Sequence, residues 1–358
     1  MGYVAPGLDE RTRQFLAPVL DHHDPDCVSA TLYLGSHDPS VPVGADAVRV
    51  TGDLDDAAAA GLIRADGIDV LVDLCGHAVQ GRLGVFVRRP APVQVSWAGY
   101  GQTTGAPEVD YLIRADGVDV PGAQDDCVET IWGIGPAMRP FRPDPHPAPT
   151  PAPARTQGFV TFGSCSHPAQ LSDQTLDAWA RILGRVTGSR LVLRHRYYVD
   201  DVLQSGVLMR LAARGIDTDR IVFKGATQQP AYYQSFAEID LALDTSPVSD
   251  WSASLDALAN GVPVLTLAGP DHVSRLGAAA VGPLGLDELI AESWDDYVER
   301  AVQLVCDVQA LDALRRRVRV AFDRSAVRDE EGFTRRLEAA FAVMFDRWRE
   351  RRSGLSAA

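Results

Sequence analysis

The chain has 358 residues, of which 46 % are hydrophobic and 23 % are charged, as in ordinary globular proteins. This length suffices for two domains, and the sequence shows neither a run of apolar residues that could cross a membrane nor a signal peptide, so a cytoplasmic protein that binds no membrane is expected. The formal net charge of −14 argues against binding along a nucleic acid, although helix ends can still hold the phosphates of a nucleotide.

The first part of the chain alternates short β-branched runs with helical stretches, which is the pattern of a parallel sheet with crossover helices. The predicted strands span residues 2–4, 30–34, 47–50, 70–75, 93–97 and 109–113. We therefore expect a Rossmann-like domain over residues 1–139.

Residues 140–156 change composition sharply, with proline at nearly every second position up to Arg155. Proline fixes φ and lacks an amide donor, so this stretch is predicted to be a semi-rigid linker without helix or central strand.

After the linker the alternation of strands and helices resumes, which predicts a second Rossmann-like domain over residues 157–330. Its predicted strands are 158–163, 191–194, 221–224, 239–244 and 262–267, and its predicted helices are 172–186, 202–214, 230–237 and 252–260. The tail, residues 331–358, carries an apolar stripe at helical spacing and is expected to dock as a terminal helix. The stripe consists of Phe333, Leu337, Phe341, Phe345 and Trp348.

Ligands of open parallel sheets collect beyond the carboxyl ends of the strands, so the loops after strands are the places to search. After Asp244 a polar loop leads into a helix near Ser252, whose first amides and hydroxyls could hold a diphosphate. Asp256, one turn further, could accept hydrogen bonds from a ribose. An equally consistent interpretation is that Ser249, Asp250 or Ser252 merely caps the helix.

Two other loops carry weaker signals. Residues 162–172, which include Ser164, are small enough for backbone amides to approach a ligand, but a turn followed by a helix capped by Ser172 explains them equally well. Residues 73–107 place His77 directly after Gly76 at a strand end, where a histidine can serve as acid or base but is more often structural.

No metal is expected, because the sequence has neither an Asp-X-Asp-like cluster nor a set of histidines and cysteines at ligand spacing. The five cysteines are scattered and are expected to be reduced.

Residues 88–116, RRPAPVQVSWAGYGQTTGAPEVDYLIRAD, resemble a hallmark stretch of the bacterial and eukaryotic O-GlcNAc transferase family, which also includes the plant O-fucosyltransferase. GYVAP near the start, DLCGH at 73–77, FGSCSHPAQLS at 162–172 and residues 242–282 agree with that family in the same order. The resemblance, which spans nearly the whole chain, implies an α/β protein of the GT-B type with two facing Rossmann-like domains, the first for the acceptor and the second for a nucleotide sugar.

The resemblance also implies an inverting transfer of a sugar from a nucleotide diphosphate, with a UDP-sugar as the expected co-substrate and no other cofactor. The residues it places at the donor are Ser164, Gln170, Tyr232, Trp251, Ser252, Ala253 and Asp256, and the catalytic candidates are His77, Gln14 and Gln170. Family members carry tetratricopeptide repeats before this region. Because the present sequence starts almost at the first strand, a small natural-product acceptor is expected beside a protein acceptor.

Several family positions are altered in this chain. Gln14 and Gln170 stand where the family has a histidine and a phosphate-binding lysine, and Tyr232 and Trp251 replace histidines that flank the nucleotide. The only lysine, Lys224, falls at none of these positions. The changes are consistent with a different donor, and they equally support the alternative of a catalytically silent GT-B accessory or binding subunit. The sequence leaves the sugar, the acceptor and the oligomeric state open.

Overall fold

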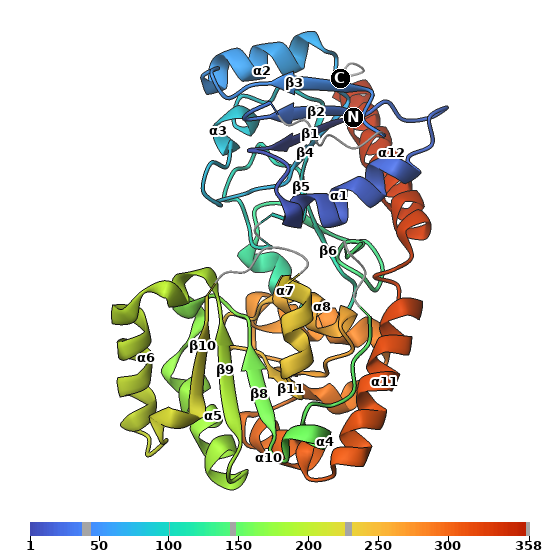
Figure 1. Cartoon of the computed structure of the whole chain (residues 1–358). Coiled ribbons are helices and arrows are strands. Elements are labelled where there is room, and N and C mark those ends of the chain that lie inside the picture. The colour runs from blue at the N-terminus through green and yellow to red at the C-terminus, as the bar shows by residue number, and fades with distance from the viewer. Residues whose placement is uncertain (38–43, 100, 144–147, 226–230, 356–358) are drawn as a thin grey trace. The chain divides into compact units, whose positions relative to one another are not determined.

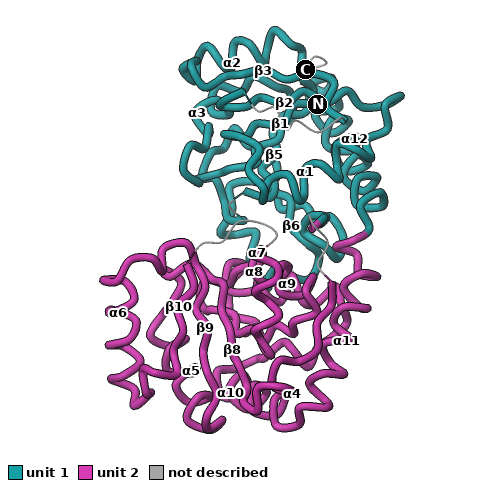
Figure 2. The backbone as a smooth tube through the Cα atoms, viewed as in Figure 1, with its two compact units in different colours: residues 1–142, 329–358 teal, residues 143–328 magenta. Residues whose placement is uncertain are grey.

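The computed structural model describes residues 1–358 except 38–43, 100, 144–147, 226–230 and 356–358. The chain divides into two compact units, shown in Figure 2. Unit 1 combines Met1–Arg142 with Asp329–Ala358, and unit 2 is the continuous stretch Pro143–Arg328. Unit 1 is therefore assembled from both ends of the chain.

Unit 1 is built on a seven-stranded sheet in the order β3-β2-β1-β4-β5-β6-β7, and every strand pair described in it is parallel. Its strands are β1 (Gly2–Ala5), β2 (Thr31–Leu34), β3 (Ala47–Val50), β4 (Val70–Asp73), β5 (Val93–Ser96), β6 (Tyr111–Arg114) and β7 (Thr130–Gly133). The six predicted strands are confirmed, and β7 was not predicted. The order reverses between β1 and β4, the switch point where open sheets of this kind bind ligands.

Three helices of unit 1 connect its strands, namely α1 (Glu10–His22), α2 (Asp56–Ala65) and α3 (Leu83–Phe86). A fourth, α12 (Glu330–Leu355), returns from the far end of the sequence, as Figure 1 shows. The apolar stripe of α12 enters the core of unit 1, where Phe333 stacks on Trp97 at 5.7 Å between ring centroids. His23 at the end of α1 hydrogen-bonds Glu338 of α12 at 2.9 Å.

Replacing Phe333 with leucine should lower the free energy of unfolding by about 1–2 kcal/mol, because the variant loses the aromatic pair with Trp97 and part of the buried area. Urea unfolding followed by circular dichroism measures this change. Val343→Ala on the same helix is the matched control, since Val343 is 43 % exposed and its truncation should change stability by less than about 0.5 kcal/mol. Equal effects of the two substitutions would contradict the packing described for α12.

Unit 2 is built on a six-stranded sheet in the order β10-β9-β8-β11-β12-β13, again with parallel pairs only among those described. Its strands are β8 (Thr161–Ser164), β9 (Arg190–Arg194), β10 (Ile221–Lys224), β11 (Leu241–Leu243), β12 (Val264–Leu267) and β13 (Ile290–Ala291). Its α-helices are α4 (Ala154–Gln157), α5 (Asp173–Arg185), α6 (Asp201–Ala212), α7 (Ala231–Gln234), α8 (Trp251–Ala259), α9 (Leu276–Val281), α10 (Trp294–Val305) and α11 (Val308–Arg324). The switch point lies between β8 and β11.

The predicted elements of unit 2 are confirmed with one difference, whereas β13 and α9 to α11 were not predicted. The predicted helix 230–237 is the short α7 followed by a 3-10 helix at Ser235–Glu238, and its predicted first residue lies outside the described residues. The expectation that the proline-rich stretch contains no helix is wrong at its end, because α4 begins at Ala154. Pro153 precedes the first helical residue, a place where a missing amide costs nothing, and the Ala154 amide is bound by the Asp240 carboxylate at 3.0 Å. Residues 144–147 of the stretch lie outside the described residues.

No helix in the described part of the chain is long and apolar enough to cross a membrane.

Candidate functional site

The switch point of unit 2 is bordered by the loop after β8, the end of β11 and the first turns of α8. A small cavity of about 20 Å³, room for about one water molecule, lies between them. Its polar lining comes from Ser164, Cys165, Ser166, Asp244 and Ser254. The sequence motifs at 162–172 and 241–267 are therefore brought together at one edge of the sheet.

Helix α8 begins at Trp251, and its N-cap is Asp250. The Asp250 carboxylate accepts a hydrogen bond from the Ala253 amide at 2.9 Å. Of the alternatives that the sequence left open, capping by Asp250 is confirmed, while Ser249 instead donates to the carbonyl of Ser274 at 3.2 Å. A carboxylate thus lies at an amide where the oxygen of a diphosphate was expected.

Asp244, at the end of β11, lies directly behind this cap. Its carboxylate accepts hydrogen bonds from the amides of Thr245 at 2.9 Å and Asp250 at 3.1 Å, and from the hydroxyl of Thr266 at 2.8 Å. Burial disfavours the charged form and raises the pKa of Asp244 to about 7. The sequence identified Asp244 only as the end of a strand.

Asp256 lies one turn into α8 and is buried, with 1 % of its surface exposed. Its two carboxylate oxygens accept hydrogen bonds from the hydroxyls of Tyr232 at 2.8 Å and Tyr233 at 3.2 Å. The structure therefore brings the predicted donor residues Tyr232 and Asp256 into contact. A ribose hydroxyl that binds Asp256 would share that carboxylate with two phenols.

Ser164 and Gln170 both follow β8. The buried Ser164 hydroxyl donates to Ser166 at 3.3 Å. Gln170 lies in the short turn Pro168–Gln170, and its side-chain oxygen accepts a hydrogen bond from the His167 amide at 2.8 Å. Because the oxygen is used in this way, the amide nitrogen is the part of Gln170 that can donate to a phosphate.

In unit 1, His77 follows β4 and is exposed. Its Nε2 lies 2.9 Å from the carbonyl oxygen of Thr104. A carbonyl only accepts hydrogen bonds, so Nε2 of the neutral ring carries the proton and Nδ1 is the basic nitrogen.

The loop that carries His77 is held by Asp73, whose carboxylate accepts hydrogen bonds from the amides of Cys75 at 3.0 Å and Gly76 at 2.8 Å. Burial is the main cause that raises the pKa of Asp73. Gly76 has a φ of 54°, a left-handed conformation that favours glycine.

The partner loop of His77 is held by a residue that the sequence did not single out. Glu129, which is fully buried, accepts hydrogen bonds from the amide of Thr104 at 2.6 Å and from the hydroxyls of Thr103 at 2.7 Å and Thr104. Glu129 thereby fixes the carbonyl that orients His77. Gln14, the other catalytic candidate of unit 1, is buried in α1, and its backbone carbonyl accepts a hydrogen bond from the backbone amide of Arg142 at 2.8 Å.

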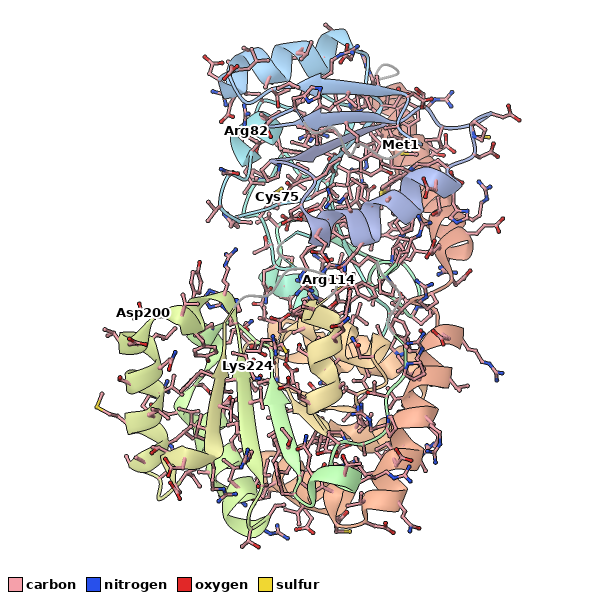
Figure 3. The ribbon with its side chains drawn as sticks, viewed as in Figure 1. Met1, Cys75, Arg82, Arg114, Asp200 and Lys224 are labelled. Carbon is pink, nitrogen blue, oxygen red and sulfur yellow. The ribbon has the colours of Figure 1, made fainter. Side chains whose placement is uncertain are left out.

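Unit 1 also has a pocket of about 340 Å³ at the carboxyl ends of β1, β2 and β3. It is lined by Pro6, Gly35, Ser36, Gly52, Gln80, Gly81 and Arg82. Glycine is required at position 52, because a Cβ atom there would lie 1.8 Å from the carbonyl oxygen of Gly35. Arg82, labelled in Figure 3, is anchored by Asp56 at 2.9 Å and by the carbonyls of Thr51 and Leu54 at 3.1 and 3.0 Å.

Two Rossmann-like units with parallel sheets and polar loops at their switch points define the GT-B class of glycosyltransferase folds. Residues 46–126 and 160–337 match the sequence profile of Glycosyl transferase family 41. The chain belongs to this family, as the resemblance predicted.

Relatives of known name support the assignment. A protein of Hordeum vulgare named "Probable UDP-N-acetylglucosamine--peptide N-acetylglucosaminyltransferase SPINDLY" is 33 % identical over 97 % of this chain and 38 % of its own length. The chain thus spans less than half the length of that relative. A mutant O-GlcNAc transferase of Thermobaculum terrenum is 32 % identical with a TM-score of 0.91, over 97 % of this chain and 67 % of its own.

A more distant solved structure agrees in fold alone. Anabaena HepE in complex with UDP and glucose has a TM-score of 0.58 at 14 % identity, over 92 % of this chain and 97 % of its own.

Proposed function

We propose that this protein transfers a sugar from a UDP-sugar to a hydroxyl acceptor with inversion at the anomeric carbon. The observation that carries the proposal is the position of α8, whose first turn lies at the switch point of unit 2 in a chain of family 41. The amides of Ser252 and Ala253 and the hydroxyl of Ser252 would bind the diphosphate, and Asp256 with Tyr232 would bind the ribose. The names of the relatives, which include UDP, support uridine as the base.

The side chains that would do the chemistry are few. In an inverting transfer the acceptor oxygen attacks the anomeric carbon directly, the bond to the diphosphate breaks, and a base takes the acceptor proton. Nδ1 of His77 is suited to that role, because Nε2 is held by Thr104 and a neutral imidazole accepts a proton near neutral pH. Gln170 would donate a neutral hydrogen bond to the departing diphosphate.

The pocket at the edge of unit 1 supports a small acceptor. Its volume of about 340 Å³ lies within the range of small-molecule sites. Its lining is neutral apart from Arg82, whose guanidinium is engaged by Asp56 and two carbonyls. We infer a compact, uncharged acceptor rich in hydroxyl groups.

One observation favours the alternative of a silent binding subunit. The Ala253 amide, on which a donor phosphate would depend, already binds Asp250. A silent subunit would bind no nucleoside diphosphate, or would bind one without turning over its sugar ester.

Calorimetric titration with UDP, GDP and dTDP tests the donor site. UDP is expected to bind, and Ser252→Ala is expected to raise the Kd of UDP about 10- to 100-fold, because a hydrogen bond to a charged group is worth about 1.5–3 kcal/mol. Asp256→Asn should weaken UDP through its ribose contact.

The matched control for this titration is Ser205→Ala, an exposed serine on α6 of the same unit, which should leave the Kd unchanged. Absence of binding by all three nucleotides would remove the donor and with it the proposed transfer. Release of free sugar from the matching nucleotide sugar then separates an enzyme from a silent subunit.

A further inference from the structure

The N-terminus of α8 holds an anion of its own. The carboxylate of Asp250 accepts a hydrogen bond from the Ala253 amide at 2.9 Å, and the backbone amide of Asp250 donates to the carboxylate of Asp244 at 3.1 Å. Negative groups are stabilised at a helix N-terminus by the unsatisfied amides and by the helix dipole. A phosphate group of a ligand would be held there by the same interactions.

The carboxylates of Asp244 and Asp250 are the charged or titratable groups named at this end of the helix. Across the described residues, neither Asp244 nor Asp250 has an arginine, lysine or histidine within ion-pair distance. The lysine Lys224 pairs with Glu238 at 3.1 Å instead. A diphosphate that approached α8 would therefore meet the carboxylate of Asp250 on the helix cap, without a cation paired to that carboxylate among the described residues.

We propose that Asp250 is a built-in competitor for the donor's diphosphate: its carboxylate occupies the Ala253 amide, must leave it when the nucleotide binds, and thereby sets a low affinity for nucleoside diphosphates. The inference rests on the proposed function, since it assigns the diphosphate to α8. It makes Asp250 a residue that determines donor affinity through charge, without any role in bond breaking.

The substitution Asp250→Asn isolates the charge. Asparagine is as good an N-cap as aspartate and has the same shape, so the helix keeps its cap while the competing anion becomes neutral. At an effective dielectric constant of about 20, two unit charges about 4 Å apart repel by enough to change a Kd at least about tenfold. The Kd of UDP should therefore fall by about tenfold or more in the variant.

Two controls separate charge from structure. Uridine carries no phosphate, so its affinity should not change in Asp250→Asn, and UMP should show an intermediate gain. Asp200, labelled in Figure 3, caps α6 of the same unit by accepting from the Val202 amide at 2.8 Å. Asp200→Asn therefore repeats the same chemical change at another helix and should leave UDP binding as it is.

Calorimetry of UDP, UMP and uridine with the wild type and both variants decides the matter, with thermal unfolding as the check that each variant is folded. Tighter binding of UDP to Asp250→Asn, including binding that appears only in that variant, supports the proposal. Equal or weaker UDP binding by Asp250→Asn, or an equal gain for uridine, overturns the proposal and leaves the donor site intact. If UDP binds to none of the three proteins, the proposed function itself fails.

Discussion

Replacing His77 with alanine should lower the rate of sugar transfer by about 10²–10⁴-fold, the usual contribution of a positioned general base. The physical reason is the hydrogen bond from Nε2 to the carbonyl of Thr104 at 2.9 Å, which leaves Nδ1 as the nitrogen that takes the acceptor proton. The measurement is kcat with saturating UDP-sugar and an acceptor identified by screening small hydroxyl compounds.

The control for His77→Ala is His22→Ala, a partly exposed histidine of the same unit that is not a candidate for catalysis. UDP affinity should stay unchanged in both variants, because the proposed donor residues belong to unit 2. A loss of UDP affinity equal to the loss of rate would show that His77 acts on donor binding, and an unchanged rate would end its assignment as the base.

The second large effect concerns stability and pH. Asp244 has a pKa of about 7 in the folded chain, against an ordinary value of 3.8, because it is fully buried. The native state therefore holds the proton more tightly than the unfolded state. The stabilisation from this proton is complete below about pH 4 and is lost as pH rises towards 7, and the difference of about three pKa units corresponds to on the order of 4 kcal/mol.

Asp244→Asn should remove this dependence. An asparagine oxygen can still accept from the amides of Thr245 and Asp250, and its nitrogen can donate to the hydroxyl of Thr266. The free energy of unfolding of the variant minus that of the wild type should rise between about pH 4 and pH 7 and level off above. Urea unfolding at a series of pH values measures the difference, and a difference that is independent of pH would contradict a protonated Asp244.

The sequence predicted those parts of the fold that rest on local pattern. Except for β7 and β13, the strands of both sheets were predicted, because buried parallel strands are short β-branched runs between turns, and β10 was predicted with its observed bounds. The strands β7 and β13 and the helices α9 to α11 were missed. β13 has only two residues, and the helices that follow it carry many charged side chains.

The location of the site could be predicted from the sequence, but the hydrogen-bond contacts of its side chains could not. The motifs around His77, Gln170 and Trp251 all lie after strands, where a parallel sheet gathers its loops. The contacts that decide their chemistry join residues far apart in sequence. Glu129 holds Thr104 across 25 positions, and Tyr232 reaches Asp256 across 24, distances over which no local pattern operates.

The return of α12 to unit 1 has a consequence for folding during synthesis of the chain. Residues 143–328 leave the ribosome as one uninterrupted piece and can fold while synthesis continues. Unit 1 can complete its fold only after α12 has been synthesised, because the His23–Glu338 hydrogen bond joins residues 315 positions apart. Until α12 has been synthesised, the ring of Trp97 has no Phe333 to stack on it. A nascent or truncated chain that stops before residue 329 therefore exposes an apolar surface, which chaperones bind and which promotes aggregation.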